Sequence, residues 1–314
     1  MTKITIIGAG NVGSTIAYTL AATGNADEVV MIDINQKRAL GEALDIRQSA
    51  PFCAPISIYA GDYADAAGSN IVIITSGIAR KPGQTRLELA QTNVDIIKSI
   101  IPQITKYAPD ATYIIVANPV DILTYAFIKC SGIPANRVIG SGTILDTARL
   151  RQRLSEYYNI SQQNIHAWVF GEHGDSSFIP WSQASISGVP IDCFDDAFHG
   201  RNAMMPDLNR AEVEAYVRKS GGRIIERKGA TYYAVAASVN HICSSLSSRL
   251  DRTMTVSTLM QGEYGISDVC LSVMNIVGDG GANGKILYPL SDDELALLHK
   301  SANALKEVIS GLTI

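Results

Sequence analysis

Charged residues, cysteines and long apolar runs are all scarce in this sequence. Only 18% of its 314 residues are charged, whereas globular proteins average about 25%, so we expect additional buried surface, such as a contact between subunits. The net charge of -4 provides no basic surface for nucleic acid. No apolar run has the length of a membrane span, and no stretch is typical of a signal peptide. We therefore expect neither a nucleic-acid nor a membrane partner.

The few cysteines are dispersed along the chain. None of the five belongs to a C-x-x-C pair; they are Cys53, Cys130, Cys193, Cys243 and Cys270. An odd and scattered set is typical of reduced thiols rather than of disulfides or a zinc site. The pattern predicts a cytoplasmic protein with no metal centre.

A glycine motif follows the first predicted strand. The β-branched run Lys3–Ile7 ends in Gly8-Ala9-Gly10-Asn11-Val12-Gly13, and residues 14–22 have a helical pattern. A G-x-G-x-x-G sequence between a strand and a helix is typical of dinucleotide binding, because the glycines let the backbone and the helix N-terminus approach a pyrophosphate. The competing interpretation is an ordinary α/β turn.

An acidic residue ends the second predicted strand. Asp33 follows residues 28–32 and lies 20 residues after Gly13. A carboxylate at this distance accepts hydrogen bonds from both ribose hydroxyls and repels a 2′-phosphate. The sequence therefore predicts NAD, rather than NADP, as the cofactor.

The first half continues to alternate between strand and helix patterns. Strand-like runs at 56–59, 71–75 and 113–117 and a helical stretch at 87–107 predict a doubly wound parallel sheet of the Rossmann type. Ligands of such sheets lie at the carboxyl ends of the strands, where Thr75 and Asn118 fall. Asn118 could bind a ribose or a substrate oxygen, or only cap the turn at Pro119.

The loop between Gly77 and Leu89 carries Arg80, Lys81 and Arg86 around a Pro82-Gly83 turn signal. It can be a flap that brings cations to an anionic ligand, or a solvated basic loop.

The second half has a different pattern. Residues 186–191, 253–260 and 269–277 are predicted as antiparallel strands, with a turn at Asn283-Gly284. We expect an NAD-binding domain at 1–141 and an α+β catalytic domain at 142–314. A helix predicted at 143–158 places Asp146 and Arg149 on one face, which suits either a plain ion pair or a site.

His173 follows the apolar run 167–170 and lies in Gly171-Glu172-His173-Gly174-Asp175. Glycines allow a substrate to come close, and imidazole moves protons near neutral pH. A structural turn histidine is the alternative.

The chain resembles the NAD-dependent L-lactate and L-malate dehydrogenases over its full length. The matching segments are the glycine motif 8–13, Asp33, Ala117-Asn118-Pro119-Val120-Asp121, Asp146-Thr147-Ala148-Arg149 and 171–175. The resemblance implies a small 2-oxo or 2-hydroxy acid as substrate and an NAD site composed of Gly8, Gly10, Asn11, Val12, Gly13, Asp33, Thr75, Gly77, Asn93, Val116 and Asn118.

The resemblance also implies catalytic roles. His173 donates a proton to the substrate carbonyl, Asp146 holds the ring, and Arg149 binds the carboxylate. Arg86 polarises the carbonyl, and Asn118 orients the substrate oxygen. These are the groups that ketone reduction needs.

The choice of substrate depends on the residues around the reacting carbon. In the resembling family the position of Arg80 carries Arg in malate enzymes and Gln in lactate enzymes. Opposite a methyl group an unpaired Arg would be costly, which favours malate. Glu172 and Thr231 match the lactate type instead. We predict an L-malate dehydrogenase, with an L-lactate dehydrogenase as the alternative and a non-catalytic dinucleotide-binding protein as a third possibility.

Arg151 and His166 match positions where bacterial lactate dehydrogenases bind fructose 1,6-bisphosphate across a subunit two-fold axis. The resemblance thus implies a homo-oligomer, as a tetramer or a dimer, with an allosteric anion site. Interface residues without a ligand are the alternative.

Overall fold

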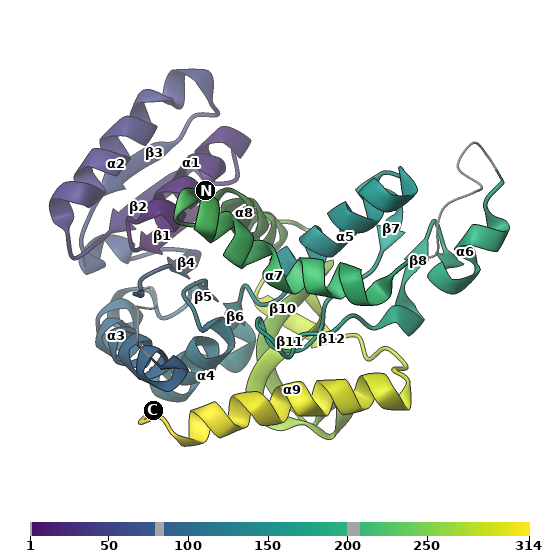
Figure 1. Ribbon diagram of the computed structural model, residues 1–314. Coiled ribbons are helices and arrows are strands. Elements are labelled where there is room, and N and C mark those ends of the chain that lie inside the picture. Colours follow the sequence, from purple (N-terminus) through teal and green to yellow (C-terminus); the bar gives the residue numbers. More distant parts are fainter. Residues whose placement is uncertain (1, 79–84, 200–207) are drawn as a thin grey trace.

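The computed structural model describes residues 2–78, 85–199 and 208–314 (Figure 1). In the first half the elements are β1 (Lys3–Ile7), α1 (Asn11–Thr23), β2 (Glu28–Ile32), α2 (Gln36–Gln48), β3 (Ser57–Ala60), β4 (Ile71–Ile74), α3 (Arg86–Tyr107), β5 (Thr112–Ile115), α4 (Val120–Ser131) and β6 (Val138–Gly140). In the second half they are α5 (Ile144–Tyr158), β7 (Ile165–His166), β8 (Ser185–Ile186), β9 (Val189–Pro190), α6 (Ile191–Ala197), α7 (Arg210–Lys228), α8 (Tyr233–Leu246), β10 (Arg252–Gln261), β11 (Ser267–Gly278), β12 (Gly281–Lys285) and α9 (Asp292–Ser310).

One mixed sheet passes through both halves. Six parallel strands have the order β6-β5-β4-β1-β2-β3, and β10, β11 and β12 continue it as antiparallel strands beyond β6. The sequence of strand additions reverses between β1 and β4, which is where ligands of doubly wound sheets bind. The predicted Rossmann-type sheet with an α+β second half is confirmed.

The join between the halves was not expected from the sequence, which indicated only two domains of different pattern. Gly140 of β6 instead pairs with Ser257 of β10. A Cβ atom at Gly140 would lie 2.4 Å from the Thr124 hydroxyl oxygen and 2.9 Å from Cβ of Ser257. The absence of a side chain therefore lets β10 reach the edge of the parallel sheet.

Both faces of the parallel sheet are buried. On β4, Ile71 and Ile73 pack into one apolar cluster with α1, α2 and α8, whereas Val72 and Ile74 pack into another with α3 and α4. Figure 1 shows α1 and α2 on the opposite side of these strands from α3 and α4. Alternate side chains point to opposite faces of a strand, so four consecutive apolar residues serve two cores.

Two local predictions were wrong. The Asn283-Gly284 turn lies inside β12, because the chain reverses before it, where Gly280 and Gly281 have positive φ values of 85° and 117°. The single strand at 186–191 is two short strands separated by Ser187 and Gly188, both with positive φ. In both places residues in the left-handed region set the turn.

Across the part of the chain that the structure describes, every helix is too short or too polar to cross a membrane.

Candidate active site

The glycine motif connects β1 to α1 at the carboxyl edge of the sheet. Gly8 has φ +107°, and Thr75 donates from its hydroxyl to the Gly8 carbonyl at 3.0 Å. A Cβ atom at Gly13 would lie 1.8 Å from that same carbonyl oxygen. Only glycine at position 13 therefore lets α1 start this close to the end of the strand.

The glycine motif, the first turn of α1 and Asp33 form a corner, here called the cofactor corner, that fits a dinucleotide. A Cβ atom at Gly10 would meet nothing within 4 Å, and Gly10 caps α1 without any side-chain hydrogen bond. The first-turn N–H groups of α1 are therefore left for phosphate oxygens. Asp33 lies beside them and accepts from the Ala9 N–H at 2.6 Å, with further lone pairs for ribose hydroxyls.

Asn93 connects two loops at this edge. Its side-chain oxygen accepts from the Ile78 N–H at 2.8 Å, and its amide donates to the carbonyl oxygens of Asn118 and Ile78 at 2.7 and 3.2 Å. Gly77 lies against it, because a Cβ atom there would be 3.4 Å from the Asn93 side-chain oxygen. Asn93 is fully buried and holds the loops that carry Gly77 and Asn118.

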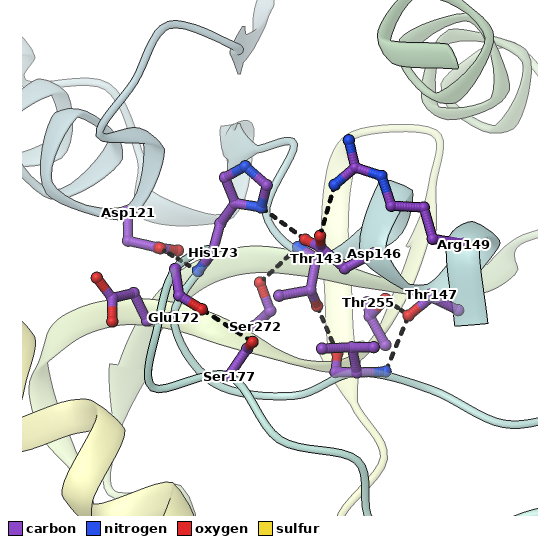
Figure 2. A network of polar contacts seen from close by, with 12 residues as sticks. Asp121, Thr143, Asp146, Thr147, Arg149, Glu172, His173, Ser177, Thr255 and Ser272 are labelled. Atoms are coloured by element: carbon purple, nitrogen blue, oxygen red, sulfur yellow. Dashed lines mark hydrogen bonds and ion pairs between the residues drawn. The ribbon is translucent and has the colours of Figure 1, made fainter. Parts of the chain in front are cut away.

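Three ionisable side chains form a connected row in the second half (Figure 2). His173 Nδ1 lies 2.6 Å from Asp146 Oδ2, and the other oxygen of Asp146 accepts from Arg149 at 2.9 Å. Asp146 and Arg149 lie three residues apart in α5, on one helix face. With Nδ1 engaged by Asp146, the second ring nitrogen of His173, Nε2, is left for another partner.

The electrostatics of this row favour a protonated imidazole. The negative charge of Asp146 raises the pKa of His173 to about 9, against burial, which lowers it. Burial opposes the ionisation of Asp146, but the charges of His173 and Arg149 outweigh it and lower the pKa of this carboxyl group. The ring of His173 is therefore protonated at neutral pH, and Asp146 both orients it and stabilises its charge.

The loop that carries His173 is held through three consecutive backbone N–H groups. That of Gly171 donates to the carbonyl of Ser272 in β11 at 2.8 Å. The next, of Glu172, donates to the Ser301 hydroxyl of α9 at 2.7 Å. The third, of His173, donates to Asp121 of α4 at 2.8 Å. No role for Asp121 or Ser301 was predicted from the sequence.

A cavity of 230 Å³ lies beside this row and brings together three of the predicted substrate residues, Asn118, Arg149 and Thr231. Its lining includes Val116, Asn118, Asp146, Arg149, His173, Thr231 and Gly221. Gly221 lies beside this arginine, because a Cβ atom there would be in van der Waals contact with the Arg149 guanidinium at 3.6 Å. Arg218 of α7 also lines the cavity and donates to the Ser177 carbonyl; only its place in the tertiary fold reveals it.

Some predicted residues are not part of this geometry. Arg80 lies outside the described residues, and so does the side chain of Arg86, although Arg86 begins α3. Arg151 donates from Nε to the carbonyl of Ala167, the residue after His166, and lines a 430 Å³ cavity between α5 and α8. His166 is exposed on β7. Among the described residues no group of His, Cys, Asp and Glu side chains is arranged to hold a metal ion.

Known proteins resemble this chain along its whole length. It is 48% identical over 312 residues to the L-lactate dehydrogenase of Acetivibrio thermocellus, covering 99% of this chain and 98% of that relative. It is 45% identical over 311 residues to L-lactate dehydrogenase 1 of Clostridium acetobutylicum, with 99% and 98% covered. A crystal structure of a lactate dehydrogenase from a deep-sea metagenome library superposes with a TM-score of 0.94 at 34% identity, covering 99% and 98% of the two chains.

These relatives overturn the prediction of malate as substrate. Both curated relatives carry the name L-lactate dehydrogenase, which favours the alternative. The malate prediction depended on a single residue, Arg80, and on the assumption that its charge faces the substrate. Thr231, the residue that pointed to lactate, does line the cavity.

The family comparison covers both halves of the chain. Residues 2–140 match the NAD-binding domain of lactate/malate dehydrogenases, and residues 143–313 match their alpha/beta C-terminal domain. The cofactor corner fits the cofactor of this domain, and the row at His173 places an imidazole and a guanidinium in the lining of one cavity. The chain belongs to the NAD-dependent lactate/malate dehydrogenase family.

Proposed function

We propose that the protein is an L-lactate dehydrogenase that interconverts pyruvate and L-lactate. The observation that carries the proposal is that His173, Asp146 and Arg149 contact one another in a row and line the same cavity. The names of the relatives support the choice of substrate. A cavity of 230 Å³ with the Thr231 side chain in its wall suits an acid whose reacting carbon carries only a methyl group.

The residues of the cavity have separate tasks in this reaction. Arg149 binds the substrate carboxylate with the guanidinium N–H groups that Asp146 does not use. His173 then donates a proton from Nε2 to the carbonyl oxygen, and the neutral imidazole takes it back in lactate oxidation. NAD supplies the hydride chemistry at its nicotinamide ring. Asp146 stabilises the imidazolium before the proton leaves.

Other residues support these steps. Asn118 is exposed at the carboxyl end of β5 and can orient the substrate oxygen, while Asn93 fixes its backbone. Arg86 polarises the carbonyl in this proposal, and Thr231 limits the size of the substrate. Gly8, Gly10 and the N-terminus of α1 bind the pyrophosphate, and Asp33 binds the adenine ribose.

The substrate is tested by measuring kcat/KM for NADH oxidation with pyruvate and with oxaloacetate in parallel. We expect pyruvate to be preferred by at least about 100-fold, because a poorly fitting second carboxylate costs several kcal/mol. Arg80→Gln serves as the matched variant and should lower only the residual activity with oxaloacetate. A preference of the wild-type enzyme for oxaloacetate would contradict the proposal.

We also propose that the chain forms a homo-oligomer in the cytoplasm. Leu40 and Leu44 are exposed on α2, with 53% and 39% of their surface accessible, and the 430 Å³ cavity between α5 and α8 is lined mainly by apolar surface. Apolar surfaces of this kind support a contact between subunits. The free state of all five cysteines supports a reducing compartment. Light scattering after gel filtration measures the assembly, and a monomeric mass would contradict it.

A further inference from the structure

Three acceptor groups, here called braces, hold the His173 loop by accepting hydrogen bonds from its backbone N–H groups. These three braces differ in charge. The carbonyl of Ser272 and the hydroxyl of Ser301 are neutral acceptors, whereas the brace at His173 itself is the carboxylate of Asp121. Asp121 is 2% exposed and lies in the first turn of α4. Burying a carboxylate is costly, and a neutral acceptor would satisfy one N–H group equally well. The charge therefore calls for an explanation beyond the hydrogen bond.

We propose that Asp121 is a positioning residue for proton transfer, which fixes the backbone of His173 and stabilises its imidazolium through its negative charge. The inference rests on the proposed role of His173 as the acid-base group. Two carboxylates then act on one ring from two different helices. Asp146 of α5 contacts Nδ1 directly, whereas Asp121 of α4 acts through the backbone and through space.

The charged groups around His173 leave this contribution intact. Asp146 contributes most to raising the pKa of His173, Asp121 raises it further, and Arg149 lowers it. Glu172 directly precedes His173 in the chain, and its charge raises the pKa of Asp121. Because Arg149 already pairs with Asp146, the charge of Asp121 is not cancelled by that ion pair.

Asp121 is ionised in the pH range where His173 titrates. Burial raises the pKa of Asp121 to about 6, while the Ser257 side chain of β10 and the His173 N–H lower it. The Cys270 thiol of β11 stays neutral beside it, because burial raises its pKa well above its usual value. The pKa of His173 is about 9, so Asp121 carries its charge throughout that titration.

The test compares Asp121→Asn with Ser301→Ala. Asparagine keeps an acceptor for the His173 N–H but removes the charge, whereas Ser301→Ala removes the neighbouring brace and no charge. The pKa of His173 is measured without substrate, from the pH dependence of its acylation by diethyl pyrocarbonate, which reacts with the neutral ring. Peptide mass spectrometry quantifies the product, and the exposed His199 is the internal reference.

We expect Asp121→Asn to lower the pKa of His173 by about one unit, as loss of a nearby opposite charge does. In the pH profile of kcat for pyruvate reduction, the fall at high pH should shift to lower pH by the same amount, with KM unchanged. Ser301→Ala should reduce kcat without moving the pKa. If Asp121→Asn does not fold, Asp121→Ser replaces it, because serine is smaller and still accepts a hydrogen bond.

An unchanged pKa of His173 in the Asp121 variant, or equal shifts in both variants, would overturn the inference. Because the acylation needs no turnover, this result is independent of whether the wild-type enzyme reduces pyruvate. Failure of the proposed substrate and failure of the role of Asp121 are therefore separate outcomes.

Discussion

The two halves of the molecule build their parts of the site by different means. In the first half, the cofactor corner consists of backbone that glycines leave bare, and its central motif is contiguous from Gly8 to Gly13. In the second half, the row around His173 consists of side chains that come from far apart in the sequence, and Asp121 reaches it from the first half. Asp146 lies 27 residues from His173, Asp121 lies 52 residues from it, and Ser301 lies 129 residues from Glu172.

The two halves are therefore sensitive to different kinds of substitution. A backbone cradle fails when a side chain is added, because added atoms collide with the main chain. A side-chain row fails when one charge is removed, because the remaining groups lose their partner. Substitutions can therefore separate cofactor binding from proton transfer.

The largest expected effect comes from His173→Ala. Removing the proton donor should lower kcat for pyruvate reduction by about 10³- to 10⁴-fold, as for other general acids. NADH binding, measured by fluorescence titration, should stay within about twofold of wild type, since the cofactor corner is unchanged. A variant that retains most of its turnover would show that proton transfer does not depend on His173 and that the two halves do not separate cofactor binding from proton transfer.

Asp146→Asn should lower kcat at neutral pH by roughly 100-fold, because the imidazolium loses its main stabiliser. Pyruvate reduction needs the protonated ring, so it is supported below the pKa of His173 and lost as pH rises through it. That pKa is about 9 in the wild-type protein. In the variant, the pH at which the activity falls should decrease towards about 6.5. A pH-rate profile that does not move would contradict the assignment of Asp146.

Gly13→Ala tests the cradle. Its Cβ atom would lie 1.8 Å from the Gly8 carbonyl oxygen, and a strain of about 3 kcal/mol weakens NADH binding by roughly 100-fold. Gly41→Ala is the matched control, because nothing lies within 4 Å of its Cβ position in α2. That control should bind NADH normally and raise the melting temperature. Equal affinities in both variants would mean that the cradle tolerates a side chain.

Asp33→Ser should change the choice of cofactor. Without the carboxylate, the preference for NADH over NADPH in kcat/KM should fall at least about tenfold, because the 2′-phosphate is no longer repelled. Asp110→Ser removes an exposed acid at the opposite edge of the sheet, before β5, and should leave the preference unchanged. The ratio is measured by initial rates with both cofactors, and identical ratios in the two variants would exclude Asp33 as the selector.

The smallest effect concerns Arg151 and His166. Fructose 1,6-bisphosphate should lower KM for pyruvate by about fivefold, a typical coupling between sites. Arg151→Gln should abolish the response, since the bisphosphate loses a cation from each subunit. A KM that does not depend on the bisphosphate in the wild-type protein would remove the anion site.

Much of the fold could be read from local patterns. The run Ile71–Ile74 predicts a buried strand because four consecutive apolar residues face two cores, and Ser291 begins α9 with a capping box that includes Glu294. The prediction of a turn at Asn283-Gly284 was wrong, because the chain already reverses at Gly280 and Gly281, where φ is positive. Asp121 stood in a recognisable motif, but nothing local indicates that its partner is 52 residues away.

The cofactor corner and the residues of the row around His173 could be predicted from the sequence, because both depend on residue types at fixed spacings. The pairing of β10 with β6 at Gly140 and the contacts that hold the His173 loop became visible only in the folded chain. The physical reason is that a short motif sets its own backbone geometry, whereas a buried charge takes its pKa from neighbours that packing brings together.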